Sequence, residues 1–135
     1  MPFNPVGDLA EHLETSGYGT RDASIFEGSV RPERKAAPTV PRNAIFVSNP
    51  TEGEGATGVF GDPFKIRNPS LQIRIRNKSR SVGDLTATNM YNTLAGASIV
   101  GYLLITMQGS GPLFLGQNNK RAYEWSINIT MMYVK

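Results

Sequence analysis

A period-two pattern close to the C-terminus constrains the fold of this chain more than any other feature. Six apolar residues alternate there with four polar ones: Tyr123, Trp125, Ile127, Ile129, Met131 and Tyr133 against Glu124, Ser126, Asn128 and Thr130. Successive side chains of a strand point to opposite faces of its sheet, so the pattern predicts a long strand with one buried face. Strands usually have only about five or six residues. We therefore expect a large sheet or a neighbouring subunit to cover this one.

The N-terminal segment is predicted to form a short helix. Asn4 is a suitable N-cap, Pro5 fits the first helical position and Gly17 suits the C-terminal end. One side of this helix is apolar, at Val6, Leu9, Ala10 and Leu13. His12, the only histidine, lies off that stripe, and we expect it to be solvated.

A second helix is predicted to begin near Val82. Ser81 followed by Asp84 resembles a capping box, and Gly96 marks the end of the helix. The apolar residues of this segment form one stripe, at Ala87, Met90, Tyr91 and Leu94. The helix has no basic face, whereas a recognition helix for DNA usually brings Arg or Lys toward the phosphates.

The remaining strands are predicted at residues 24–30, 43–48 and 71–76, with a central strand at 99–107 that is apolar on both faces. A short apolar piece at 113–115 lies between two turn clusters. In the segment 71–76, Leu71, Ile73 and Ile75 alternate with Gln72, Arg74 and Arg76, so the arginines are expected on the outward side. Together these elements predict an α+β sandwich, with one mixed, mostly antiparallel sheet of four to six strands and two helices packed on one face.

The length of 135 residues favours a single domain over residues 1–135. Two segments interrupt the pattern of helices and strands: a basic, proline-rich arm at 31–42 and a glycine-rich loop at 50–63. The net charge of +3 is only mildly basic. The lack of cysteine excludes disulfides and thiolate metal sites. No apolar run reaches the roughly 20 residues that a membrane-spanning helix needs.

The sequence offers little catalytic chemistry. Gly53, Gly55 and Gly58 match the dinucleotide-binding pattern G-x-G-x-x-G, but the segment 59–63 that follows cannot begin a helix of useful length. Ser110 lies between two glycines without the strand–turn–helix pattern of a hydrolase nucleophile. We therefore expect neither an enzyme nor a bound cofactor.

Nucleic-acid binding by the sheet is a different class of function. Such a sheet exposes aromatic rings beside basic residues. Here Tyr123 and Trp125 share a strand face with Ile and Met, which is typical of a core. A small nucleic-acid-binding α+β domain is therefore kept as an alternative and not as the leading hypothesis.

Several parts of the chain together resemble a known family. They are a strand with alternating arginines at Gln72–Lys78, a helix end at Tyr91–Gly96, a turn at Pro112–Asn118 and the long strand at Tyr123–Tyr133. With the Gly-Tyr-Gly-Thr turn at Gly17–Thr20, this arrangement is similar to the minor capsid and tail terminator (tail completion) proteins of long-tailed bacteriophages. The resemblance extends over nearly the whole chain from its first helix onward.

The resemblance implies a structural virion protein. Proteins of that family assemble into a homo-oligomeric ring, typically a hexamer, at the head-proximal end of the tail. The ring stops polymerisation of the tail tube, docks onto the head connector in the neck and leaves a channel through which DNA passes. The implied partners are further copies of the chain, the tail tube protein and the connector, with no membrane. The implied location is the virion, after assembly in the host cytoplasm, and another neck or tail tube component is the alternative.

A ring requires lateral surfaces that recruit further copies, and it arises from head-to-tail contacts whose rotation closes. Arginine suits such contacts because its planar guanidinium binds a carboxylate through two hydrogen bonds. The candidate interface residues are therefore Arg31, Arg34, Lys35, Arg42, Arg74, Arg76, Lys78, Arg80, Glu52 and Glu54. Two alternatives stay open for the basic residues: they are solvated charges that deter aggregation of a strand edge, or they line a DNA channel.

Overall fold

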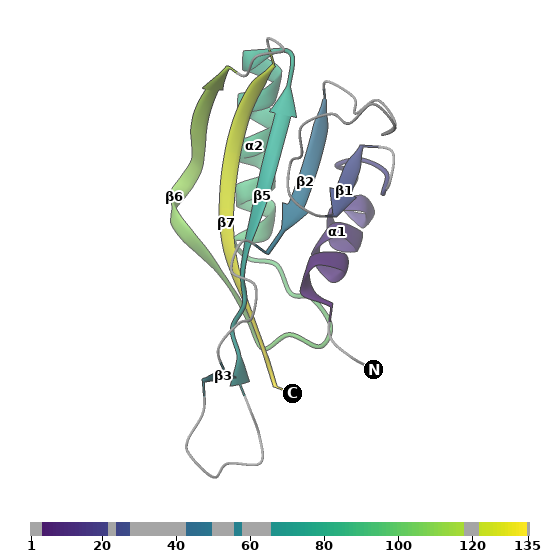
Figure 1. Cartoon of the computed structure of the whole chain (residues 1–135), viewed down its shortest axis with the longest axis vertical. Coiled ribbons are helices and arrows are strands. Elements are labelled where there is room, and N and C mark those ends of the chain that lie inside the picture. The colour runs from purple at the N-terminus through teal and green to yellow at the C-terminus, as the bar shows by residue number, and fades with distance from the viewer. Residues whose placement is uncertain are drawn as a thin grey trace, which may run out of the picture.

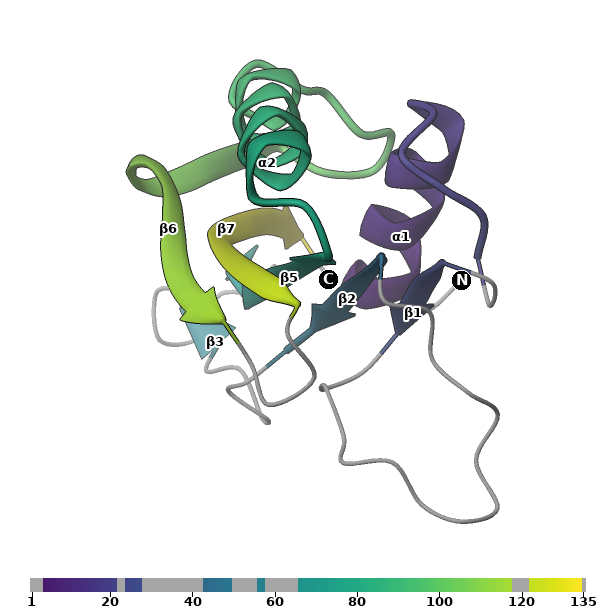
Figure 2. The same ribbon diagram turned by 90° about the horizontal axis from the view of Figure 1, so that it is seen from above.

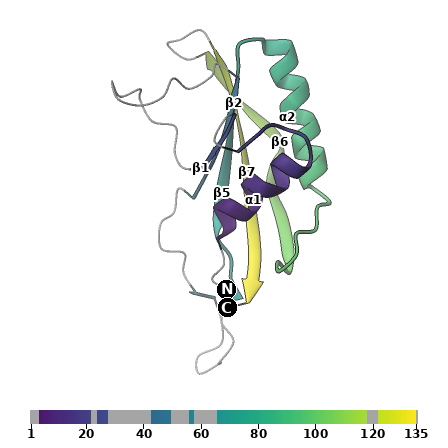
Figure 3. The same ribbon diagram turned by 90° about the vertical axis from the view of Figure 1, so that its right-hand side faces the viewer.

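The computed structural model describes residues 4–21, 24–27, 43–49, 56–57, 66–117 and 122–134. In chain order the elements are α1 (Pro5–Thr15), β1 (Ile25–Glu27), β2 (Ala44–Ser48), β3 (Ala56–Thr57), β4 (Ile66–Arg67), β5 (Ser70–Asn77), α2 (Arg80–Leu94), β6 (Leu104–Gln117) and β7 (Tyr123–Val134). Both helices lie on the same face of one sheet (Figures 1 and 3). The predicted α+β class, with a single sheet and two helices, is confirmed.

The main sheet has the strand order β1-β2-β5-β7-β6. β1 runs parallel to β2, and the other neighbouring strands are antiparallel, so the sheet is mixed and mostly antiparallel as predicted. β4 continues along β7 in the register of β5, and β3 pairs with β4. Seen from above, α2 covers the β6 side of the sheet and α1 covers the β1 side (Figure 2).

The core lies between the sheet and the two helices, and β7 contributes most of its large side chains. Trp125, Ile127, Ile129 and Met131 are at most 1% exposed, and Tyr133 is 5% exposed. They pack with the inward face of β5 and the buried sides of α1 and α2. The prediction that the aromatic side of this strand faces inward is confirmed. This side of β7 is covered by the chain's own helices. Within the sheet, β7 lies between β5 and β6.

Both ends of α1 follow the predicted capping pattern. The side chain of Asn4 accepts a hydrogen bond from the N–H of Gly7 at 3.2 Å. At the other end Gly17 has φ +90, and its N–H donates to Glu14 O while the N–H of Tyr18 donates to Leu13 O. This pair of hydrogen bonds is a Schellman motif, which requires a left-handed residue that glycine adopts without steric cost.

The predicted start of α2 is wrong by one half-turn. Its N-cap is Ser79 and not Ser81, and the Ser79 hydroxyl accepts from the N–H of Val82 at 3.4 Å. Asp84 is then too far along the helix to close a capping box. Its carboxylate accepts instead the indole N–H of Trp125 at 2.6 Å, so a core contact determines its position.

The predicted central strand at 99–107 is also wrong. Only its second half is strand, because β6 begins at Leu104 and continues through the expected turn as far as Gln117. β6 lies at the edge of the main sheet and pairs with β7. The residues before it form the connection from α2, in which Ile99 packs on the core while Val100 and Leu103 are exposed. Apolar residues on both sides of this segment therefore do not indicate burial on both sides.

Candidate assembly surfaces

The outer edge of β6 is an exposed and largely apolar border of the sheet. The 14-residue strand pairs with β7 on one side, and no described strand pairs with its other side. Leu104, Leu113, Phe114 and Leu115 are between 39% and 59% exposed along it. An edge strand presents unpaired backbone N–H and C=O groups to any further strand, and proteins usually protect such edges. We refer to these four side chains and this backbone as the β6 edge.

A bulge with a shift of the strand register interrupts β6 at its middle. Gln108 pairs with Asn128, but the next paired residue is Leu113, opposite Ser126. Gly109 has φ +82, and its carbonyl accepts the hydroxyl of Tyr91 on α2 at 2.6 Å. A hydrogen bond thus joins the bulge to α2. A depression of about 430 Å³ lies at the bulge and is lined by the residues of the bulge itself and by Ser126 and Asn128 of β7. A bulge hinders pairing with a further strand at its own position. The parts of β6 before and after the bulge can still pair with another strand.

An aromatic cluster supports the end of β6. The ring of Phe114 lies 5.4 Å from Trp125 and 6.3 Å from Tyr123, measured between centroids. The guanidinium carbon of Arg80, the first residue of α2, lies 4.6 Å from the centroid of the Phe114 ring. Within the described residues Arg80 forms no ion pair. The residue is exposed, and its guanidinium makes a cation–π contact with Phe114. We use the name basic corner for Arg80 and Phe114 together with Leu115, the exposed residue that follows Phe114 in β6.

The arginines of β5 point to the face of the sheet that the helices leave open, as predicted. Arg74 and Arg76 alternate with the buried residues of that strand. Both make contacts within the same chain: Arg74 Nε lies 3.4 Å from Glu124 Oε1, and the guanidinium of Arg76 lies 5.4 Å from the centroid of Phe46. Lys78 follows at an exposed position beside β2, where its N–H donates to Asn43 Oδ1. Arg80, by contrast, lies on α2 against Phe114 of β6.

The remaining candidate interface residues lie outside the described residues. They are Arg31, Arg34, Lys35, Arg42, Glu52 and Glu54. The acid that does meet Arg74 is Glu124, which the sequence places on the polar side of the long strand. The alternation pattern predicts which face it occupies, but the strand register that brings it to Arg74 is not visible in the sequence.

An acidic surface at the opposite end of the sheet was not predicted as a site. We call it the acidic edge, formed by Glu11 and Glu14 on α1 and Glu27 on β1. Arg21 lies among them: its Nη2 is 2.9 Å from Glu27 Oε2, and its backbone N–H donates to Glu14 at 2.7 Å. The hydrogen bond and charge of Glu27, with the charges of Glu11 and Glu14, raise the pKa of Arg21 above its ordinary value. The helical spacing of Glu11 and Glu14 could have indicated this surface, but their proximity to Glu27 could not be foreseen.

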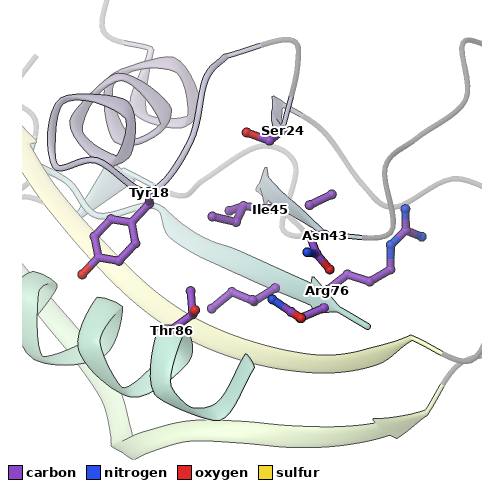
Figure 4. A pocket seen from close by; sticks show the side chains of 9 residues that line it. Tyr18, Ser24, Asn43, Ile45, Arg76 and Thr86 are labelled. Atoms are coloured by element: carbon purple, nitrogen blue, oxygen red, sulfur yellow. The ribbon is translucent and has the colours of Figure 1, made fainter. Parts of the chain in front are cut away.

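A cavity of about 190 Å³ lies between the turn after α1, the strands β2 and β5, and α2 (Figure 4). Tyr18, Asn43, Arg76 and Thr86 contribute to its lining, and none of the described lining residues is a carboxylate. Its hydroxyl and amide groups position no nucleophile beside a base.

A second cavity lies beside α1 and includes His12. The expectation that His12 is solvated is wrong: its side chain is half-buried, and Nε2 has no hydrogen-bond partner among the residues that the structure describes. Burial follows from the connection at 98–100, which lies against the same side of the helix as Asp8 and Glu11. In the part of the chain that the structure describes, no group of three His, Asp or Glu residues is arranged to hold a metal ion.

The two helices were also compared with the length and hydropathy of a membrane span, and neither described helix is long and apolar enough to cross a membrane. A scan against protein-family models gives no match for this chain, and a search of curated proteins gives none either. The surfaces described above are therefore the basis for inferring function.

Proposed function

We propose that this chain is a structural virion protein that oligomerises into a ring at the head-proximal end of a phage tail. The ring terminates polymerisation of the tail tube and joins the tail to the head connector. The observation that supports self-assembly most strongly is the β6 edge, a long border strand with exposed Leu and Phe side chains. The resemblance of the sequence to tail terminator proteins supports the specific role.

The physical argument starts from the asymmetry of the sheet. One border is the 14-residue β6, and the other is the three-residue β1 covered by α1. A contact between unlike borders is head-to-tail, and repeated head-to-tail contacts give a ring when the rotation closes. Burying the β6 edge against a second copy would satisfy its backbone and remove its apolar side chains from water.

The open face of the sheet gives less support to nucleic-acid binding. Arg74 is close to Glu124, and Arg76 lies over Phe46, so both basic groups already have contacts within the chain. Of the three aromatic residues of β7, Trp125 and Tyr133 are buried and cannot stack on a base, and Tyr123 is stacked on Phe114. DNA is therefore proposed only to pass through the ring.

The proposal is tested first by mass. Native mass spectrometry of the full chain, alone or with tail tube protein, is expected to show multiples of 14.7 kDa, and negative-stain images should show rings. Phage lacking the gene should make overlong tails without heads. Loss of all tails would indicate a tube protein instead. A persistent monomer that neither caps tubes nor binds the connector would contradict the proposal, as would salt-dependent DNA binding by a monomer.

A further inference from the structure

We infer that neighbouring copies join by placing the acidic edge of one chain against the basic corner of the next. This inference rests on the proposed ring and specifies which two surfaces meet in it. Glu11, Glu14 and Glu27 form the first surface, and Arg80 with Phe114 and Leu115 forms the second. The contact is heterologous, so each copy uses a different surface toward each neighbour.

The two surfaces lie at opposite lateral ends of the molecule. β1 and β6 are the two borders of the main sheet, with β2, β5 and β7 between them. α1 packs over β1 and β2, and α2 packs over β5, β7 and β6 (Figures 1 and 2). Surfaces at opposite ends cannot neutralise each other within one chain, but they meet when copies are arranged side by side.

Among the described residues, the acidic edge has more negative than positive charge. It comprises three carboxylates and one guanidinium, and the guanidinium of Arg21 is engaged mainly by Glu27, while Glu14 accepts the backbone N–H of Arg21. Glu11 is exposed and forms no ion pair with any described residue. The surface therefore has at least one carboxylate available for a cation of another molecule.

At the basic corner, Arg80 forms no ion pair with a described residue. Two acids of the neighbouring elements have other contacts, because Asp84 accepts the indole N–H of Trp125 and Glu124 lies beside Arg74. The cation–π contact with Phe114 holds the guanidinium of Arg80 in place, which reduces the entropy lost when it binds a carboxylate. Arginine and aromatic residues are both enriched in protein–protein interfaces, and here an ordered arginine lies on an exposed phenylalanine.

A second copy fits this corner better than another occupant. A nucleic-acid site needs several cations that follow the phosphates, whereas the corner has one described cation among apolar side chains. A partner with exposed carboxylates satisfies the charge of Arg80, and the chain itself presents such a surface. Other acidic partners are distinguished by the experiment below.

The test is a charge exchange between the two surfaces, with the full chain and under conditions in which the unaltered chain forms rings, alone or on tail tubes. Glu11→Lys and Arg80→Glu should each weaken ring assembly by at least about 30-fold, since a like-charge contact replaces an attractive one. An equimolar mixture of the two variants, or the double variant E11K with R80E, should restore rings, because every contact again joins opposite charges. Lys78→Glu is the matched control, with the same change of charge at an exposed position two residues from Arg80, and it should assemble normally.

The possible outcomes test the docking inference and the proposed function separately. If the unaltered chain forms rings and both single variants do so equally well, the docking inference is wrong while the proposed function stands. The same holds if the single variants fail and the mixture does not recover although circular dichroism shows both to be folded. If the unaltered chain forms no ring in either condition, the proposed function itself is wrong.

Discussion

At the scale of single residues, the contact between Gly83 and Trp125 determines how closely α2 approaches the sheet. A Cβ added at Gly83 would overlap the six-membered ring of the indole. The indole N–H is at the same time fixed by Asp84, one position further along the helix. Trp125 is the only tryptophan of the chain, so its fluorescence reports on this contact.

Gly83→Ala is expected to destabilise the fold. Alanine favours a helix over glycine by about 1 kcal/mol, but overlap with a rigid ring in a packed core costs about 1–3 kcal/mol. We expect a net loss of stability in urea unfolding followed by tryptophan fluorescence. The control is Gly96→Ala, where an added Cβ meets no atom within 4 Å, and it should unfold like the unaltered chain. Equal stability of the two variants would contradict the close approach.

Asp84→Ala should destabilise the fold by about 1–3 kcal/mol, because it leaves the indole N–H of a buried ring without its partner. The same unfolding measurement provides the value. Asp84→Asn is the informative companion, since its amide oxygen can still accept the indole N–H and should recover part of the loss. If alanine and asparagine are equally harmful, the role of Asp84 is not this hydrogen bond.

At the scale of elements, β6 combines two properties that seldom occur together. It is long and apolar enough to be a core strand, yet it lies at the border of the sheet. The bulge fastened to α2 by Tyr91 keeps the middle of the strand from pairing, while Leu113, Phe114 and Leu115 stay exposed beyond it. This distribution is expected of an assembly border that pairs at a defined place.

Leu115→Glu should prevent ring assembly without unfolding the chain. The side chain is 40% exposed, so a glutamate can keep its carboxylate in water in the monomer, but in the proposed interface it would face the carboxylates of the acidic edge. Size-exclusion chromatography and the thermal unfolding curve of the monomer are the measurements. Leu85→Glu is the control, because Leu85 is 63% exposed on α2 and belongs to neither docking surface, and it should leave assembly unchanged.

At the scale of the whole molecule, an open sheet covered by helices on one face gives a subunit with two unlike lateral borders. Assembly of such subunits links stability to concentration, because only folded copies bind each other. The melting temperature should therefore rise as the protein concentration is raised about 100-fold. Arg80→Glu should show a melting temperature that does not depend on concentration, as should Leu115→Glu. A concentration-independent melting temperature of the unaltered chain would argue against assembly.

Much of this architecture follows from local patterns in the sequence. The caps of α1, the inward face of β7 and the outward face of Arg74 and Arg76 were predictable, because each depends on periodicity or on residues a few positions apart. The start of α2 was not, since Ser79 and Ser81 are both suitable caps and the contact between Asp84 and Trp125 fixes the register. The half-burial of His12 was missed for the same reason, as a distant connection covers it.

The sequence by itself determined the α+β class, the long alternating strand and the face of the sheet on which each of its residues lies, because strand and helix periods are properties of consecutive residues. Only the tertiary structure decided that β6 is a border and β7 is interior, that Arg80 rests on Phe114, and that Glu27 joins the acids of α1. Strand order and surface charge arise from residues far apart in the chain. An apolar strand has the same local pattern whether its second side meets another strand or a further copy of the protein.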